Sequence, residues 1–311
     1  MKAIDERMQH HLKTRAAIVS ITSNSVLIIL KLAAGLFMHS VSVISEAVHS
    51  AIDLVAAIVA FMSVRHSGKP ADKDHHYGHG KIENISATIE ALLIFGAAVY
   101  IIYQAVQKLE HGNIEVESLG LGTLVMAASA AVNFIVSRYL FKVAHLTDSA
   151  ALRGDALHLR TDVWTSLGVL GGLAAIKLTG LEVLDPVVAI VVALLIIKAA
   201  WELTKESFSD ILDTRIPAKD EELIHRVLAE HSHAITDYHK LRTRKSGHVR
   251  YIDLHIVVPG RSMVKDAHSL SDLITSRIKE RLANSHVLVH IEPCDGMCNG
   301  CHLDCKSMAH S

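Results

Sequence analysis

One arrangement of acidic and histidine side chains occurs twice in the sequence. The pattern acid-x-x-His-x-x-x-Asp is formed by Glu46, His49 and Asp53 and again by Asp155, His158 and Asp162. On a helix, residues four positions apart share one face, so each His and Asp pair can direct one nitrogen and one oxygen to a common point. Two such helices supply four ligands, and a tetrahedral set of imidazole and carboxylate groups suits Zn²⁺. The repetition therefore predicts a metal site with the ligands His49, Asp53, His158 and Asp162.

Both copies of the pattern lie in long apolar segments. Hydrophobic residues make up 50% of the 311 residues and the mean hydropathy is +0.32, which excludes an ordinary soluble enzyme. A bilayer core of roughly 30 Å needs about 20 mostly apolar residues in a helix. Six such windows occur, over residues 16–38, 41–64, 85–109, 119–143, 156–178 and 183–203. The sequence therefore predicts an α-helical membrane protein with six transmembrane helices within residues 16–206.

The apolar surroundings are what make the repeated pattern informative. Spacing alone is weak, because His268 and Asp272 have the same spacing in a polar part of the chain. A charged aspartate in the middle of a bilayer costs at least roughly 2.5 kcal/mol, and such residues usually mark an ion or proton pathway. The structural alternative is that these polar groups pair with one another and hold the helices together. For Glu46 and Asp155 three possibilities stay open: a place near a helix end, a place facing the opposite side of the cavity, or support of the metal ligands from behind.

Basic residues in the short connections predict the orientation of the chain. Cytoplasmic loops carry an excess of Lys and Arg, and here that excess lies between the second and third and between the fourth and fifth apolar segments. Both termini are then cytoplasmic, with residues 1–15 as a basic N-terminus. The first apolar segment lacks the small-residue cleavage site that follows the short apolar stretch of a signal peptide. We therefore expect it to remain in the mature protein. A net charge of −1 gives no indication of a nucleic acid partner.

Downstream of the last apolar segment, residues 207–293 are predicted to form a small soluble α+β domain. We expect helices over 218–230 and 264–282 and strands over 251–258 and 286–291, with one more strand after the first helix. Alternation in the second strand puts Ile252 and Ile256 on one face and His255 on the other. Two helices covering one face of the sheet are the natural packing of such a domain.

All four cysteines lie in the tail, residues 294–311. Cys294, Cys298, Cys301 and Cys305 form a Cys-x₃-Cys-x₂-Cys-x₃-Cys run. In a reducing compartment thiolates more often bind metal than form disulfides, and Cys298 and Cys301 have the CxxC spacing of zinc sites. A metal cluster and a tail with reactive thiols both stay open.

Five stretches of the sequence resemble the cation diffusion facilitators, a family of metal transporters of the ferrous-iron and zinc efflux type. They are SVSVISEAVHSAIDLVA, PADKDHHYGHGKIE, DALHLRTDVWTS, LDP and HIEPC, and the resemblance covers residues 13–293. It implies six spans, a cytoplasmic ferredoxin-like, metallochaperone-like domain, and a homodimer that exchanges a divalent metal ion for protons. It places the transport site at His49, Asp53, His158 and Asp162, and His49 resembles the zinc-selective branch.

The same resemblance implies three further features outside the transport site. A loop metal site falls on Asp72, His75 and His79. A two-metal site in the cytoplasmic domain falls on His239, His255, His268, His290 and Glu292, where relatives carry Asp at the last position. A salt bridge between Lys81 and Asp213 is implied at the membrane surface of the dimer.

These predictions describe a proton-coupled antiporter that exports Zn²⁺ from the cytoplasm, with Cd²⁺, Co²⁺, Fe²⁺ and Mn²⁺ as further candidate ions. They do not describe an enzyme. Zn²⁺ is expected both as substrate and as regulatory ligand, and the expected location is the inner (cell) membrane of a bacterium. Two other classes stay open. An intramembrane zinc-dependent hydrolase needs an open coordination position and a base such as Glu46. A membrane metal sensor would use the cytoplasmic domain and the cysteine tail as its output.

Overall fold

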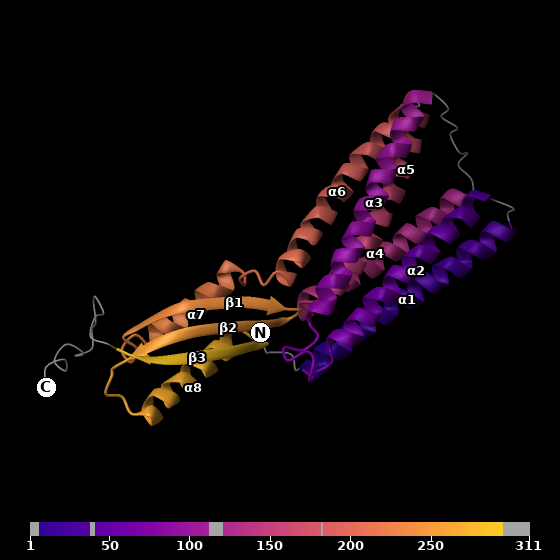
Figure 1. The fold of residues 1–311 in the computed structure, drawn as a ribbon. Coiled ribbons are helices and arrows are strands. Elements are labelled where there is room, and N and C mark those ends of the chain that lie inside the picture. Colours follow the sequence, from indigo (N-terminus) through magenta and orange to yellow (C-terminus); the bar gives the residue numbers. More distant parts are fainter. Residues whose placement is uncertain (1–5, 38–40, 112–120, 182, 295–311) are drawn as a thin grey trace. The chain divides into compact units, whose positions relative to one another are not determined.

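The computed structural model describes residues 6–37, 41–111, 121–181 and 183–294 of the chain. The chain divides into two compact units, of which one spans Ile4–Ile211 and the other contains Leu212–Ser311. The first unit consists of helices, and the second combines helices with a small sheet (Figure 1).

Long helices make up the described part of the first unit (Figure 1). They are α1 (Glu6–Phe37), α2 (Val41–Ser67), α3 (Lys81–His111), α4 (Leu121–Thr147), α5 (Ala150–Thr179) and α6 (Leu184–Ile211). α5 begins after the N-cap Ser149, whose hydroxyl accepts a hydrogen bond from the Leu152 N–H group. It ends at Gly180, whose φ of 73° is a left-handed conformation that glycine adopts without strain.

Four of these helices are long and apolar enough to cross a membrane. The candidate spans among the described residues are Arg7–Phe37, Lys81–Glu110, Leu124–Thr147 and Leu184–Ile211. The other two helices, α2 and α5, carry the repeated pattern of acids and histidines. The first unit is therefore a helical region with four candidate spans, and the count of six spans stays a prediction.

Many alanines are buried between the helices, and many large apolar residues are exposed on the outside of the bundle. Ala17, Ala57 and Ala87 are fully buried, whereas Leu30 and Leu36 are exposed. The most extensive packing joins α3 with α6, α1 with α2, and α4 with α5. Small side chains allow two helix backbones to approach closely, and lipid accommodates the exposed apolar faces. The burial pattern is the one expected of helices that associate inside a bilayer.

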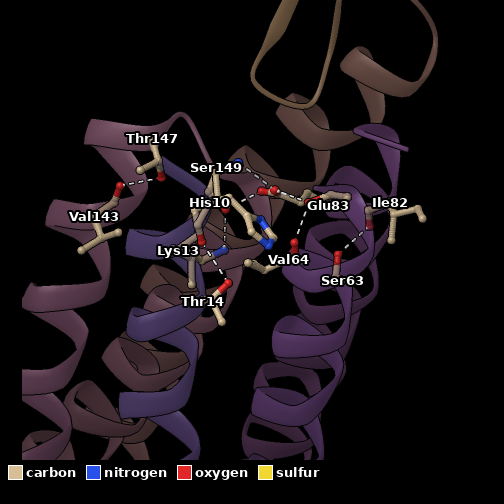
Figure 2. A network of polar contacts seen from close by, with 12 residues as sticks. His10, Lys13, Thr14, Ser63, Val64, Ile82, Glu83, Val143, Thr147 and Ser149 are labelled. Atoms are coloured by element: carbon tan, nitrogen blue, oxygen red, sulfur yellow. Dashed lines mark hydrogen bonds and ion pairs between the residues drawn. The ribbon is translucent and has the colours of Figure 1, made fainter. Parts of the chain in front are cut away.

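A buried polar network joins several helices at one end of the bundle (Figure 2). Glu83 of α3 accepts hydrogen bonds from Lys13 Nζ of α1 at 2.9 Å and from Ser67 Oγ of α2 at 2.7 Å. The hydroxyl of Ser149, which caps α5, donates to the other carboxylate oxygen of Glu83. Lys13 and Glu83 are almost completely buried. Because a buried charge without its partner is costly, this network holds the ends of α1, α2, α3 and α5 together.

The second unit is a three-stranded sheet with two helices. Its elements are α7 (Ala218–Glu230), β1 (Asp237–Ser246), β2 (Val249–Val258), α8 (Val264–Arg281) and β3 (Ser285–Pro293). The central strand β2 is antiparallel to β1 and parallel to β3. Gly247, with a φ of 59°, lies in the tight turn between β1 and β2. The order helix, strand, strand, helix, strand is the predicted one.

The alternation of β2 separates the two faces of this sheet. Ile252, Leu254 and Ile256 are fully buried, and they form one core with Ile224 of α7 and Ile274 of α8. The residues between them point to the opposite face, which is only partly buried. Two helices therefore cover one face, as predicted, and leave the other face to the polar side chains of the strands.

Candidate metal centres

Asp53, His158 and Asp162 form the most buried of the candidate metal clusters in the described chain. One ligand atom from each residue lies within 4.8 Å of the other two. His158 Nε2 lies 3.0 Å from Asp53 Oδ1. Asp53 comes from α2 and the other two from α5, where the four-residue spacing puts them on one face. An imidazole and two carboxylates at one point are ligands that Zn²⁺ accepts, and the two negative charges match a dication.

Three residues of the repeated pattern are not assigned to this cluster. The side chains of Glu46 and His49 fall outside the described part of the chain. Asp155 is buried one turn before His158 on α5, but its carboxyl group is not among the clustered ligands. The fourth ligand and the supporting acids therefore stay predictions.

The loop between α2 and α3 folds around Asp72. Asp72 Oδ1 accepts hydrogen bonds from the backbone N–H groups of Asp74 at 3.0 Å and His75 at 2.7 Å, which closes a tight turn. His75 Nδ1 lies 3.4 Å from Oδ1, and His79 Nε2 lies 3.3 Å from Oδ2. The backbone hydrogen bond from His75 is the main cause that lowers the pKa of Asp72. The turn thus presents an ionised carboxylate between two imidazoles, and ligand atoms of all three lie within 4.8 Å of one another.

Strand register brings three histidines into one row across the sheet of the second unit. His239 of β1 pairs with His255 of β2, which pairs with His290 of β3. The carboxylate of Glu292 lies beside this row, with Oε2 2.9 Å from His239 Nε2 and Oε1 2.7 Å from His255 Nδ1. Ligand atoms of His239, His255 and Glu292 lie within 4.8 Å of one another. His290 Nε2 lies farther away, 3.9 Å from Glu292 Oε1.

Lys240 adds a positive charge to this cytoplasmic cluster. Its Nζ lies 3.6 Å from Glu292 Oε1. The hydrogen bond from His255 is the main cause that lowers the pKa of Glu292, and the charges of Lys240 and His239 lower it further. β1 is irregular here, and Lys240 has a φ of 52°. The sequence shows no sign of this bulge, so the lysine could not be assigned to the cluster before the fold was known.

His268 is not brought into the cytoplasmic cluster. It lies on α8 and pairs with Asp272 at 3.5 Å, and both side chains are exposed. α8 packs on the apolar face of the sheet, whereas the histidine row belongs to the opposite face. Its part in a two-metal site stays a prediction.

The tail and the implied salt bridge also stay predictions. Cys294 is half-buried just after β3, and Cys298, Cys301 and Cys305 lie outside the described residues. Lys81 belongs to the first unit and Asp213 to the second.

Comparison with known proteins places the whole arrangement in a family. Residues 17–212 match the model of the cation efflux transmembrane domain, and residues 216–294 match that of the cytoplasmic domain of cation efflux proteins. The chain belongs to the cation efflux family. The predicted resemblance is therefore confirmed, and this cation efflux protein is an integral membrane transporter and not an enzyme. An intramembrane hydrolase is accordingly not favoured.

Individual relatives match almost the full length of the cation efflux protein. An uncharacterized transporter of Synechocystis sp. is 35% identical over 277 residues, which are 89% of each chain. The cation-efflux pump FieF of Escherichia coli is 29% identical over 283 residues, covering 91% of this chain and 93% of the pump. The solved metal-bound C-terminal domain of the CzcD transporter from Thermotoga maritima is 30% identical and covers 24% of this chain and 88% of that chain, with a TM-score of 0.24.

One buried acid of the cation efflux protein was not assigned from the sequence. Glu90 lies within α3 and is 1% exposed. The available signal was the occurrence of an acid inside an apolar segment, the same signal that singled out Asp53 and Asp162. It was missed because Glu90 has no histidine at helical spacing beside it.

Proposed function

We propose that the cation efflux protein is a proton-coupled antiporter that exports a divalent metal ion, chiefly Zn²⁺, from the cytoplasm. The cluster of Asp53, His158 and Asp162 carries this proposal, because it offers three convergent, largely buried ligands inside a bundle of mostly apolar helices. His49 is proposed as the fourth ligand, which would complete a set of two nitrogens and two oxygens. Such a set suits Zn²⁺, and Cd²⁺, Co²⁺, Fe²⁺ and Mn²⁺ are further candidates.

The proposed assembly is a homodimer with six spans in each subunit and both termini in the cytoplasm. The basic residues of two short connections support this orientation. The relatives from Synechocystis and Escherichia coli are bacterial proteins, which supports a place in the inner (cell) membrane of a bacterium. Lys81 and Asp213 are proposed to hold the dimer together at the membrane surface.

Competition between metal and protons is the proposed source of coupling. Imidazole and carboxylate ligands bind a metal ion only when they are deprotonated, so metal binding releases protons. His158 Nε2 and Asp53 Oδ1 lie 3.0 Å apart, at hydrogen-bond distance, so a proton between them would compete with a metal ion for the same two ligand atoms. Protons that enter from the far side of the membrane would displace the ion once the helices have moved to open that side.

The loop cluster is proposed to act before transport, and the cytoplasmic cluster is proposed to regulate transport. The loop site of Asp72, His75 and His79 is exposed enough to capture metal ions and pass them on. The cytoplasmic site of His239, His255, His290 and Glu292, with His268, is proposed to bind regulatory Zn²⁺ and to draw the two cytoplasmic domains of the dimer together. Zn²⁺ bound at the cytoplasmic site would shift the conformational equilibrium of the transmembrane helices. The transport site itself is proposed to lie within the bilayer.

Flux of Zn²⁺ into proteoliposomes under a pH gradient tests the proposed function. We expect the purified wild-type protein to carry Zn²⁺ and Asp162→Ala to carry none above protein-free vesicles, because one of the convergent ligands is lost. Asp272→Ala is the matched control, since it removes an aspartate from the same His-x-x-x-Asp spacing outside the bundle. Undiminished flux through Asp162→Ala would contradict the assignment of the site. Competition among metal ions in His49→Asp tests the fourth ligand, and an unchanged metal preference would contradict its role.

A further inference from the structure

Glu90 is a buried acid that the metal cluster does not use. Its side chain is 1% exposed, and within the described residues neither carboxylate oxygen forms a hydrogen bond. Ser86 lies one turn earlier on α3, but its hydroxyl forms no hydrogen bond with Glu90 or with any other described residue. An ionised carboxylate in this place has lost its hydration and gained no donor, which is costly.

The carboxyl group of Glu90 points at α5 and not at lipid. A Cβ atom on Gly154 would collide with Glu90 Oε2, so the glycine of α5 makes room for the acid of α3. The next residue, Asp155, is also 1% exposed, and its Oδ2 has no hydrogen-bond partner among the described residues. The two acids come from α3 and α5, which pack together.

The cationic groups around this pair of acids are engaged elsewhere. His158 acts on both acids, but its Nε2 faces Asp53. Arg153, on the other side of Gly154, forms an ion pair with Glu206 of α6. Two buried carboxyl groups that have no ion-pair partner among the described residues cannot both stay ionised, because like charges repel strongly in surroundings of low dielectric constant.

We propose that Glu90 and Asp155 form a proton-binding site, distinct from the metal ligands, that holds one proton in the metal-free protein and releases it when the neighbouring cluster binds a dication. The cluster begins one turn further along α5, so the two positive charges of the ion favour the ionised form of the acid pair. The released proton passes to water on the side from which the ion entered. The acid pair thereby adds one exchanged proton to those of the ligands. This role rests on the proposed function and deepens it.

Glu90→Gln tests the proposal because it keeps the shape of the side chain and removes its exchangeable carboxyl proton. The purified full-length protein is titrated with Zn²⁺ in weakly buffered detergent solution, and an indicator dye counts the protons released. We expect Glu90→Gln to release fewer protons for each subunit than the wild type, by up to about one. We also expect its Zn²⁺ affinity at the membrane cluster to depend less steeply on pH.

Glu110→Gln is the matched control, since it changes an exposed acid of the same helix and should release as many protons as the wild type. If Glu90→Gln does not fold, Asp155→Asn removes the partner acid and must show the same loss. Equal proton release by the folded variant and the wild type overturns the proposal. Loss of Zn²⁺ binding at the membrane cluster also overturns it, because Glu90 would then be a metal ligand.

The same preparations separate this role from the proposed function. Wild-type protein is placed in vesicles, and Zn²⁺ flux driven by a pH gradient is measured. Absence of flux contradicts the proposed function itself. Normal wild-type flux together with an unchanged proton count in Glu90→Gln contradicts only the role of the acid pair.

Discussion

The membrane cluster and the cytoplasmic cluster use the same two ligand types in different surroundings. In the membrane cluster the side chains of Asp53 and His158 are 7% and 14% exposed. In the cytoplasmic cluster those of His239, His255 and Glu292 are 37%, 27% and 30% exposed. Water therefore reaches the cytoplasmic ligands and is largely excluded from the membrane ligands.

This difference in burial fits the transport role proposed for the membrane cluster and the regulatory role proposed for the cytoplasmic cluster. Charges interact strongly where the dielectric constant is low, so the buried acids must be neutralised by a metal ion or by protons. The exposed carboxylate of Glu292 is solvated, and Lys240 partly balances its charge. Under the proposed function, the cytoplasmic cluster could remain without metal at little cost in free energy and respond to the metal concentration, whereas the membrane cluster would exchange metal for protons.

Removal of one ligand from each cluster gives the largest expected contrast. We expect Asp53→Asn to lower Zn²⁺ flux by at least ~100-fold, because even residues that only support metal ligands contribute roughly 10-fold to 100-fold. Glu292→Gln should retain transport at a reduced rate. Proteoliposome flux of both variants measures this, and equal losses would mean that burial does not divide the two roles.

Buried and exposed ion pairs sharpen the same contrast in stability. Lys13→Met leaves Glu83 buried without its partner and should destabilise the protein by about 3–5 kcal/mol. Arg226→Ala breaks the exposed pair of Arg226 with Glu222, which lies four residues earlier on α7, and should change the stability little, because water screens both charges. Denaturant unfolding in detergent compares the two variants. Similar losses would contradict the buried network as the element that holds the helix ends together.

Two variants, one of Glu292 and one of the neighbouring Lys240, test the cytoplasmic cluster alone. In the background of Asp53→Asn, Glu292→Gln should weaken Zn²⁺ binding by roughly 10-fold or more, because a charged ligand is lost. Lys240→Ala should strengthen it, since the competing ammonium group is removed. Zn²⁺ titration of the full chain against a competing chelator measures both. A weaker affinity in Lys240→Ala would show that the lysine supports the site.

The smallest expected effect is the pH dependence that Glu292 gives the metal-free second unit. Its pKa is lowered in the folded protein by the hydrogen bond from His255. A lowered pKa stabilises the fold above the usual glutamate value of about 4.3, and this contribution is lost as the pH falls through the lower folded value. Hydrogen exchange of β3 amides in the intact protein should show less protection in Glu292→Gln than in the wild type at pH 7, and equal protection in strong acid. A difference that persists in strong acid would exclude this origin.

Local patterns predicted the elements of the second unit well. The helix expected over 218–230 is α7 with the same bounds, and the alternation of Ile252, Leu254 and Ile256 gives the buried face of β2. Helical spacing also brought Asp53, His158 and Asp162 into one hypothesis, although the sequence could not show how close their atoms lie. The count of six spans stays a prediction, because the described residues contain four candidate spans.

The sequence by itself determined which segments are apolar, where helices and strands form, and which family the chain resembles, because these properties depend on residue types at short spacing. Only the tertiary structure decided that Glu90 lies against Gly154, that Lys13 meets Glu83, and that Lys240 stands beside Glu292. Those contacts join residues from different elements. They depend on how the helices pack and on a bulge in β1. Neither feature can be predicted from the spacing of residues along the chain.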